Sequence, residues 1–236
     1  MAQHAPPVRG ARLGRAARAN GSEVVSGVVL LLPGSSRLSS GPVRPLGRAL
    51  LRAGAAEGLA VHAVRGAAPG AAAGWAVDEV VRRYGDVPVC LAGYGPGGLS
   101  ALRSAGHEAV NSVLALAPCL PEPAPTVSPE PVKQLAGRRV LIAHGTNDAV
   151  VDPELSFRLA ERAKKANRST CRFEVHSDGH SLREHRPEVV ALAVDFVLGA
   201  LFTGRWSRPV TDALAAPPPL GLRMPLASGF GRSLRG

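Results

Sequence analysis

The chain has 236 residues, of which 45% are hydrophobic and 19% charged, and its net charge is +10. This length and balance predict a soluble globular protein with one sizeable core. The apolar runs are shorter than the roughly 18 residues that a bilayer requires, so we expect no membrane-spanning helix.

The positive charge is concentrated at the two ends of the chain. Residues 1–22 hold four arginines and no acidic residue, and residues 204–236 hold five arginines and one aspartate, which leaves a net charge of only +2 for residues 23–203. We predict a flexible basic N-terminal tail (1–22), a folded domain (23–203) and a flexible Pro/Gly/Arg-rich C-terminal tail (204–236). Aromatic residues make up only 4%, so no base-stacking surface and no specific nucleic-acid partner is expected.

No apolar segment of a secretory signal follows the first arginines, which favours a cytoplasmic location. Cys90, Cys119 and Cys171 are far apart and odd in number, so we expect reduced thiols and neither a disulfide framework nor a metal site. Nothing in the sequence indicates that Cys90 or Cys119 is activated. No cofactor is expected. The abundance of Ala, Gly, Arg and Pro is typical of a GC-rich bacterial coding sequence.

Between the tails, short apolar runs alternate with amphipathic segments, which predicts parallel strands joined by helical crossovers. The expected helices follow the strands, and in the last of them Val190, Val194, Val197 and Leu201 are expected to face inward. The expected strands cover residues 27–32, 59–64, 87–92, 112–117, 139–143 and 172–176. The fold class is therefore α/β, with about six mostly parallel strands flanked by helices.

Polar residues gather in the loops that follow these strands, where an open parallel sheet binds its ligands. These loops are residues 33–36, 93–98, 144–148 and 178–180. Their order along the chain, a glycine-rich turn, then Asp148, then His180, resembles the α/β-hydrolase superfamily, and in particular its small dienelactone-hydrolase-like members with little or no cap. The resemblance covers roughly residues 24–202. It implies that Asp148 is the acid and His180 the histidine of a catalytic triad.

The same resemblance places the nucleophile at the tip of the turn after the third expected strand, within a Gly-x-Ser-x-Gly pattern. The flanking glycines Gly93 and Gly97 are present, but the central position is Gly95. Glycine has no side-chain atom that can attack a carbonyl. The resemblance also implies an oxyanion-hole N–H from the next residue, and Pro96 has none. The resemblance implies that the second donor is the backbone N–H of Ser35.

Two alternatives use the same residues. Gly93, Gly95 and Gly98 match a dinucleotide-binding fingerprint, although no acidic residue follows at the end of the next strand. His180 oriented by Asp148 is also a candidate for activating water without a covalent intermediate. We expect a protein derived from a carboxylester-type hydrolase, impaired or inactive by the serine route, that binds a small ester or acyl ligand.

Overall fold

The computed structural model describes residues 11–16, 24–32, 34, 41–65, 69–122 and 128–231. Their centre is a sheet with the strand order β1-β3-β2-β4-β5-β6-β7-β8. The strands are β1 (Arg12–Leu13), β2 (Gly27–Leu32), β3 (Leu59–Arg65), β4 (Val89–Tyr94), β5 (Val110–Leu116), β6 (Arg139–Gly145), β7 (Thr170–Val175) and β8 (Met224–Pro225). All pairings are parallel except that of β1 with β3.

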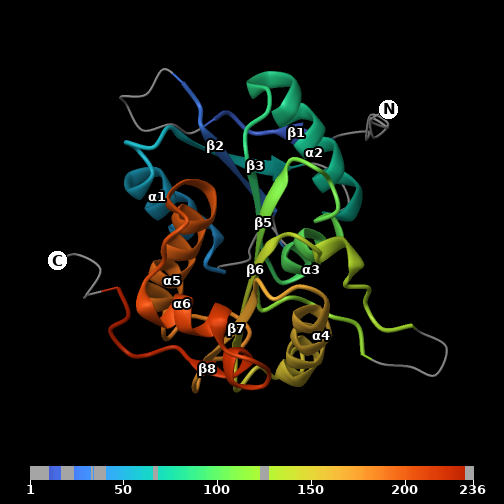
Figure 1. Cartoon of the computed structure of the whole chain (residues 1–236), viewed down its shortest axis with the longest axis vertical. Coiled ribbons are helices and arrows are strands. Elements are labelled where there is room, and N and C mark those ends of the chain that lie inside the picture. Colours follow the sequence, from blue (N-terminus) through green and yellow to red (C-terminus); the bar gives the residue numbers. More distant parts are fainter. Residues whose placement is uncertain are drawn as a thin grey trace.

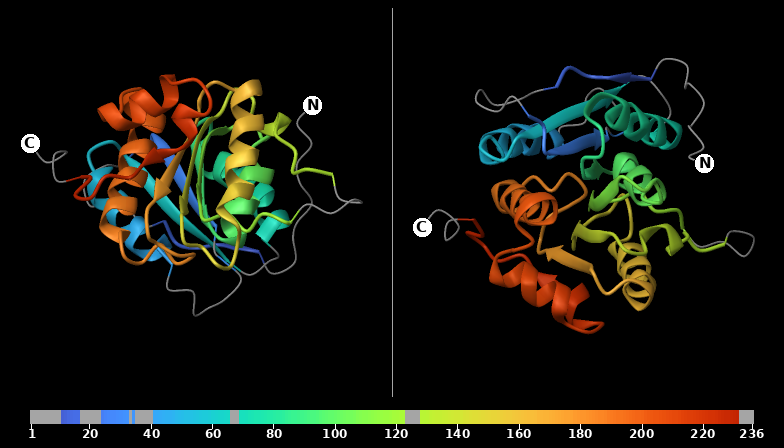
Figure 2. Two further views of the ribbon diagram at one scale, coloured as in Figure 1. Left: turned by 90° about the horizontal axis from the view of Figure 1, so that it is seen from below. Right: turned by 45° about the horizontal axis from the view of Figure 1, so that its top comes forward.

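In the part of the chain that the structure describes, six α-helices cover the two faces of this sheet, three on each (Figures 1 and 2). On one face lie α1 (Val43–Ala53), α5 (Arg186–Leu198) and α6 (Arg208–Ala215), and on the other α2 (Pro69–Tyr84), α3 (Pro96–Arg103) and α4 (Pro153–Ala166). Between β5 and β6 the only helical turn in the described residues is Lys133–Leu135. The predicted α/β architecture is confirmed, with eight strands in the described residues where about six were expected.

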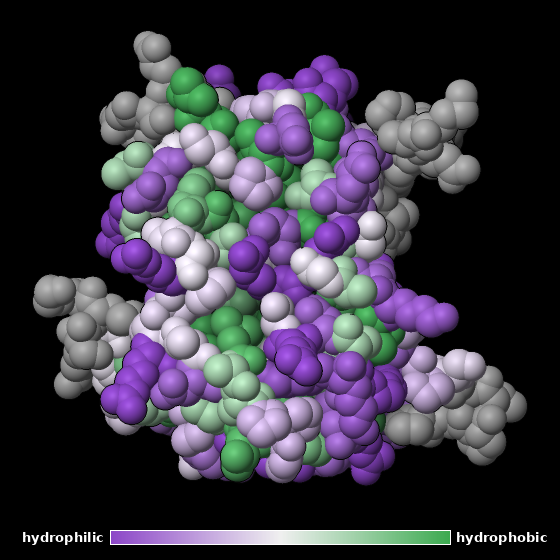
Figure 3. Space-filling model, viewed as in Figure 1, coloured by the Kyte–Doolittle hydropathy of each residue, from purple (hydrophilic) through white to green (hydrophobic). Residues whose placement is uncertain are grey.

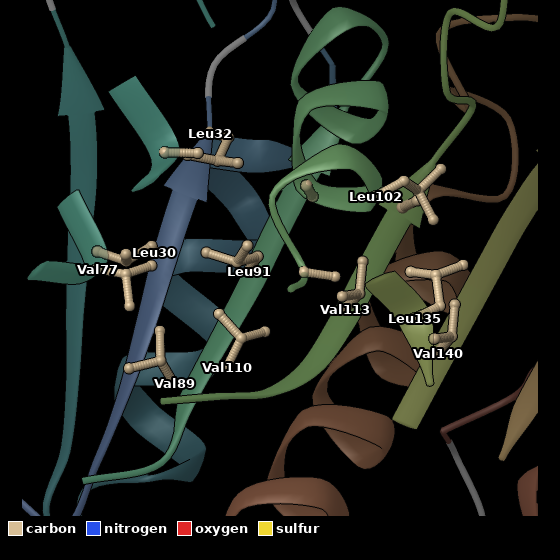
Figure 4. Close-up of a cluster of buried hydrophobic side chains, with 14 of the residues drawn as sticks. Leu30, Leu32, Val77, Val89, Leu91, Leu102, Val110, Val113, Leu135 and Val140 are labelled. Atoms are coloured by element: carbon tan, nitrogen blue, oxygen red, sulfur yellow. The ribbon is translucent and has the colours of Figure 1, made fainter. Parts of the chain in front are cut away.

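The apolar strands pack into two cores, one on each side of the sheet. Every residue of β2 is buried, because a central parallel strand is covered by helices on both faces. Figure 4 shows the core beneath α2 and α3, where branched aliphatic side chains from neighbouring strands meet those of the helices. The labelled members include Leu30, Leu91, Val113 and Val140 from the strands, with Val77 and Leu102 from the helices. On the surface seen in Figure 3, apolar and polar groups are interspersed.

The C-terminal segment differs from the flexible tail that its composition predicted. Residues 208–215 form α6, and β8 pairs with β7. Val210, Ala213 and Leu222 are fully buried. Sparse apolar residues are sufficient here because they complete a core that already exists, rather than forming one of their own.

The N-terminal segment also contributes to the sheet within its described part. Arg12 and Leu13 pair antiparallel with β3, and the Gly14 carbonyl oxygen lies 2.8 Å from Nδ1 of the buried His62. Two residues are too few to give a strand signal in the sequence, and the pairing depends on an edge that only the folded sheet offers.

The last long helix buries the predicted face only in part: Val197 is fully buried and Leu201 is buried, as predicted. Val189, Leu192 and Phe196 are fully buried, whereas Val190 and Val194 are only partly so. The helix is apolar almost all round, so its sequence does not mark one face, and packing against α1 selects it. No described helix is by itself long and apolar enough to cross a membrane; Arg186–Thr203 and Arg208–Ala215 meet the criteria only as a pair, bent by 75°.

Lys164 links the C-terminal segment to the domain through hydrogen bonds. Its buried ammonium donates to the carbonyl oxygens of Thr170, Ala213 and Leu214 at 2.8–3.0 Å. Lys164→Ala is expected to lower the free energy of unfolding by about 2–4 kcal/mol, because three carbonyls lose a charged donor. Urea denaturation measures the loss. Lys165→Ala, on the exposed side of the same helix, is the control and is expected to change stability by less than about 0.5 kcal/mol.

Candidate active site

The turn between β4 and α3 has the geometry of a sharp strand-to-helix elbow. Gly95 has a φ of +55°, in the left-handed region that favours glycine. A Cβ at Gly93 would overlap the carbonyl oxygen of Gly97, so a side chain there would open the turn. At Gly98 a Cβ would lie 3.3 Å from the carbonyl oxygens of Gly93 and Leu116. The tight packing of the elbow accounts for the glycine spacing without a dinucleotide.

Gly95 forms the tip of this elbow. A Cβ built on Gly95 would lie 3.5 Å from Nε2 of His180 and 3.5 Å from Sγ of Cys119. A side chain at this position would thus contact both the imidazole and the thiol. The elbow points at the histidine, as the resemblance implies, but it carries no nucleophilic atom.

Of the two predicted oxyanion positions, the structure describes Pro96. Pro96 is the first residue of α3 and has no N–H to donate. Ser35 lies outside the described residues.

Asp148 and His180 come together across the ends of β6 and β7. Oδ2 of Asp148 lies 2.7 Å from Nδ1 of His180. Because Nδ1 faces a carboxylate, it carries the ring proton, and Nε2 is left as the basic nitrogen. That nitrogen faces the elbow, and the His180 side chain is 18% exposed. The pair is therefore arranged to accept a proton from a group near Gly95.

A second aspartate shapes the loop that carries His180. The buried carboxylate of Asp178 accepts hydrogen bonds from the backbone N–H groups of Arg183 and His185, at 3.0 and 2.9 Å. Ser177 and Leu182, on either side of His180, have φ values of +60° and +48°. The side chain of Asp178 thus holds a strained turn that the sequence alone did not indicate.

The carboxylate of Asp148 is fully enclosed and accepts four hydrogen bonds. Oδ2 accepts from His144 and His180, and Oδ1 accepts from the backbone N–H groups of Val150 and Val151 at 2.9 and 3.0 Å. Burial by itself would raise the pKa of Asp148, but these four donors together hold that pKa well below its usual range. Asp148 is therefore a stable anion that orients His180.

His144 has a role that the sequence pattern does not indicate. Its Nε2 lies 2.9 Å from Oδ2 of Asp148, and its Nδ1 lies 2.9 Å from the Ser156 hydroxyl. Burial lowers the pKa of His144 and outweighs the attraction of Asp148. A neutral His144 that donates from Nε2 shares the Oδ2 atom of Asp148 with His180 and helps to fix the carboxylate. The turn after β6 brings Asp148 back to His144, and the packing of α4 against β6 brings Ser156 to the other ring nitrogen.

The depressed pKa values of His144 and Asp148 predict that stability falls in two stages on acidification. Each group contributes fully above its unfolded pKa, and the contribution is lost as the pH falls toward the folded value. Stability should therefore decrease below about pH 6.5 as His144 must charge, and again below about pH 3.8 as Asp148 must be protonated. Urea unfolding over a pH series measures both stages. His144→Gln should remove the upper stage only, and an unchanged upper stage would contradict this assignment.

Cys119 corrects the expectation that no cysteine is near an activating group. It lies just beyond the carboxyl end of β5, and its N–H donates to the carbonyl oxygen of Gly95 at 3.0 Å. Its Sγ is 3.9 Å from Nε2 of His180. The signal was available in principle: neighbouring parallel strands bring Gly95 and Cys119 to the same edge, but the order of the strands was needed to see it.

Comparison with solved structures gives the same architecture. The Pyrococcus furiosus esterase Pf2001 superposes with a TM-score of 0.60 at 17% identity, covering 75% of this chain and 84% of that one. Esterase PE8 superposes at 0.62 and 18% identity, over 80% of this chain and all of the other. Est1E from Butyrivibrio proteoclasticus, with ferulic acid bound, gives 0.59 and 16% identity, over 80% and 94%.

The chain has the α/β-hydrolase fold. These identities are too low to transfer an activity, and they establish the α/β-hydrolase fold alone. No family model matches the chain. Among curated proteins, the phosphoprotein of mumps virus (strain Enders) is 32% identical over 110 residues, or 47% of this chain. The chain spans only 28% of that protein's length, so the match assigns no function to this α/β-hydrolase fold.

Proposed function

We propose that this protein binds a small carboxylic ester or other acyl ligand at the carboxyl ends of β4, β5 and β6, and that it does not hydrolyse the ligand by a serine-type route. The observation that carries the proposal is the position of Gly95. A Cβ at position 95 would lie 3.5 Å from Nε2 of His180. Glycine has no side-chain atom that extends toward this nitrogen. An acyl group has room where a side chain is missing, beside an oriented imidazole.

The expected loss of reaction rate is large enough to favour ligand binding over serine-type catalysis. Removing a nucleophile from a comparable triad costs roughly 10⁶ in rate, and removing one oxyanion donor costs about 10²–10³. Gly95 and Pro96 together impose both losses. Est1E, which shares the fold, has been solved with the carboxylic acid ferulic acid bound, and this supports an acyl group as the ligand.

Two measurements test the proposal on the protein as it exists. A fluorophosphonate probe, which reports an activated serine, is expected not to label the protein; labelling would reveal a serine nucleophile and overturn the second half of the proposal. Titration calorimetry with ketone analogues of short-chain aryl esters, in which a methylene group replaces the ester oxygen, is expected to show saturable binding.

Filling the space beside Gly95 should abolish that binding. Gly95→Leu places a branched side chain against His180 and Cys119. The matched control is Gly137→Leu, because Gly137 also has a positive φ, +74°, and a Cβ there would meet nothing within 4 Å. Both variants bear a similar backbone strain of about 1–3 kcal/mol. Equal affinity in the two variants would mean that the ligand, if any, lies elsewhere.

A further inference from the structure

Three side chains form a line across the carboxyl edge of the sheet. Asp148 contacts His180 at 2.7 Å, and the opposite nitrogen of the same ring faces the sulfur of Cys119 at 3.9 Å. The three residues come from three loops, those after β6, β7 and β5. Gly95 leaves the space beside the sulfur open, since a Cβ there would be 3.5 Å from it. The order acid, imidazole, nucleophile is the one that activates a thiol.

We propose that Cys119 is the acyl acceptor of this site, that His180 removes its proton, and that the acyl donors are thioesters and activated aryl esters. The sulfur comes from β5 and replaces the oxygen that the elbow on β4 lacks. The choice of ligand class rests on the proposed function, whereas the covalent step goes beyond it.

The other two cysteines are not candidates for this step. Cys90 and Cys171 are fully buried within β4 and β7. Burial raises the pKa of each thiol to about 12. Cys119 is partly exposed, so among the three cysteines it alone combines access with a basic neighbour.

The reaction conserves atoms and charge. His180 takes the proton from the thiol as Sγ attacks the carbonyl carbon of the donor. The tetrahedral intermediate then collapses, the bond to the leaving group breaks, and His180 returns the proton to that group. The products are an acyl thioester on Cys119 and a free thiol or phenol.

His180 must act as a base during attack, because Cys119 rests as a thiol. Burial raises the pKa of Cys119, and the negative charge of Asp148 raises it further. A resting thiolate is therefore disfavoured, and proton removal has to accompany attack by the sulfur. An imidazole held by Asp148 supplies that base at the correct side of the sulfur.

The absence of an N–H at Pro96 restricts the donor. With one oxyanion donor fewer, the intermediate is poorly stabilised and partitions according to its leaving groups. An alkyl ester would expel the Cys119 sulfur again, since a thiolate is a much better leaving group than an alkoxide. Only a thioester or an activated aryl ester carries a group that leaves as readily as Cys119. Hydrolysis of the product thioester lacks the same donor, so the acylated form should accumulate.

Intact-mass spectrometry tests the proposal directly. The protein is incubated with the acetyl thioester of N-acetylcysteamine and, separately, with 4-nitrophenyl acetate and ethyl acetate. The first two are expected to add one acetyl group, mapped by peptide analysis to Cys119, and ethyl acetate none. Cys119→Ala should abolish the addition. Acetylation of a different residue, or equal acetylation of Cys119→Ala, would overturn the proposal.

The role of His180 needs a control that separates chemistry from structure. His180→Ala is expected to slow acetylation by about 10²–10⁴. The matched change is His107→Ala, since His107 also bonds a carboxylate, that of Asp78, at 3.0 Å. His107 precedes β5 and Cys119 follows it, so the length of this seven-residue strand, about 20 Å at about 3.3 Å per residue, separates them. His107→Ala should leave the rate unchanged, and circular dichroism should show both variants folded. A rate independent of His180 would mean unassisted thiol reactivity.

Failure here is distinguishable from failure of the proposed function. If Cys119→Ala still binds the ketone analogue while the unmodified protein never acquires an acyl group, the site binds without covalent capture. If ester hydrolysis requires His180 but proceeds equally in Cys119→Ala, His180 activates water and the cysteine is not the acceptor. Both results overturn the covalent step and leave ligand binding standing.

Discussion

Gly95→Ser combined with Pro96→Ala is expected to give the protein serine-type esterase activity. The serine Cβ would lie 3.5 Å from Nε2 of His180, an ordinary contact from which Oγ can reach hydrogen-bonding distance. Alanine restores an N–H at the first position of α3. Asp148 already orients His180 at 2.7 Å. The double change therefore supplies the two groups that a serine triad still needs here, the nucleophile and the oxyanion N–H.

The expected gain is labelling by a fluorophosphonate probe together with hydrolysis of 4-nitrophenyl esters that alkylation of Cys119 does not abolish. Restoring only the serine should give an activity about 10²–10³ lower than the double change, the value of one oxyanion donor. Gly137→Ser with Pro131→Ala is the control for strain and for the loss of a proline. Failure of the double variant to label, with its fold intact, would show that the elbow is not the nucleophile position.

Asp148→Ala is expected to cause the largest loss of stability of any change at the site, about 3–5 kcal/mol. Its removal leaves two imidazoles and the N–H groups of Val150 and Val151 without their acceptor in a fully enclosed space. Urea denaturation measures the difference from the unmodified protein. A loss below about 1 kcal/mol would mean that water replaces the carboxylate, so that the site is less closed than its burial indicates.

Asp148→Asn separates this structural role from the chemical one. The amide oxygen can still accept from Val150 and Val151, and the amide group turned toward His180 donates instead of accepting. His180 is then expected to carry its proton on Nε2, which removes the base that faces Cys119. Acylation of Cys119 should fall about as much as in His180→Ala, by up to about 10⁴, while most of the stability remains. Equal losses of stability in Asp148→Ala and Asp148→Asn would contradict the tautomer assignment.

The sequence by itself determined the layered fold and the pair of residues at its centre. The apolar runs in β2, β4, β5 and β6 are almost entirely buried, and such runs are read directly as strands covered on both faces. The spacing of Asp148 and His180 in loops after successive strands already placed both side chains at one edge. The absence of a side chain at Gly95 also needed no coordinates. These features are local, or depend only on the order of strand and loop.

The tertiary structure decided everything that depends on which strands are neighbours. β4 pairs with β5, although one helix separates them in the sequence, and this pairing brings Cys119 to the open side of His180. The pairing of β7 with β8 and the burial of Val210 fold a segment whose composition is that of a tail. His144 meets the Ser156 hydroxyl only because α4 packs against β6. Hydrophobic periodicity in a single sequence reports local secondary structure. It does not report which residues far apart in the chain come into contact, because the local pattern around each of them is the same with or without that contact.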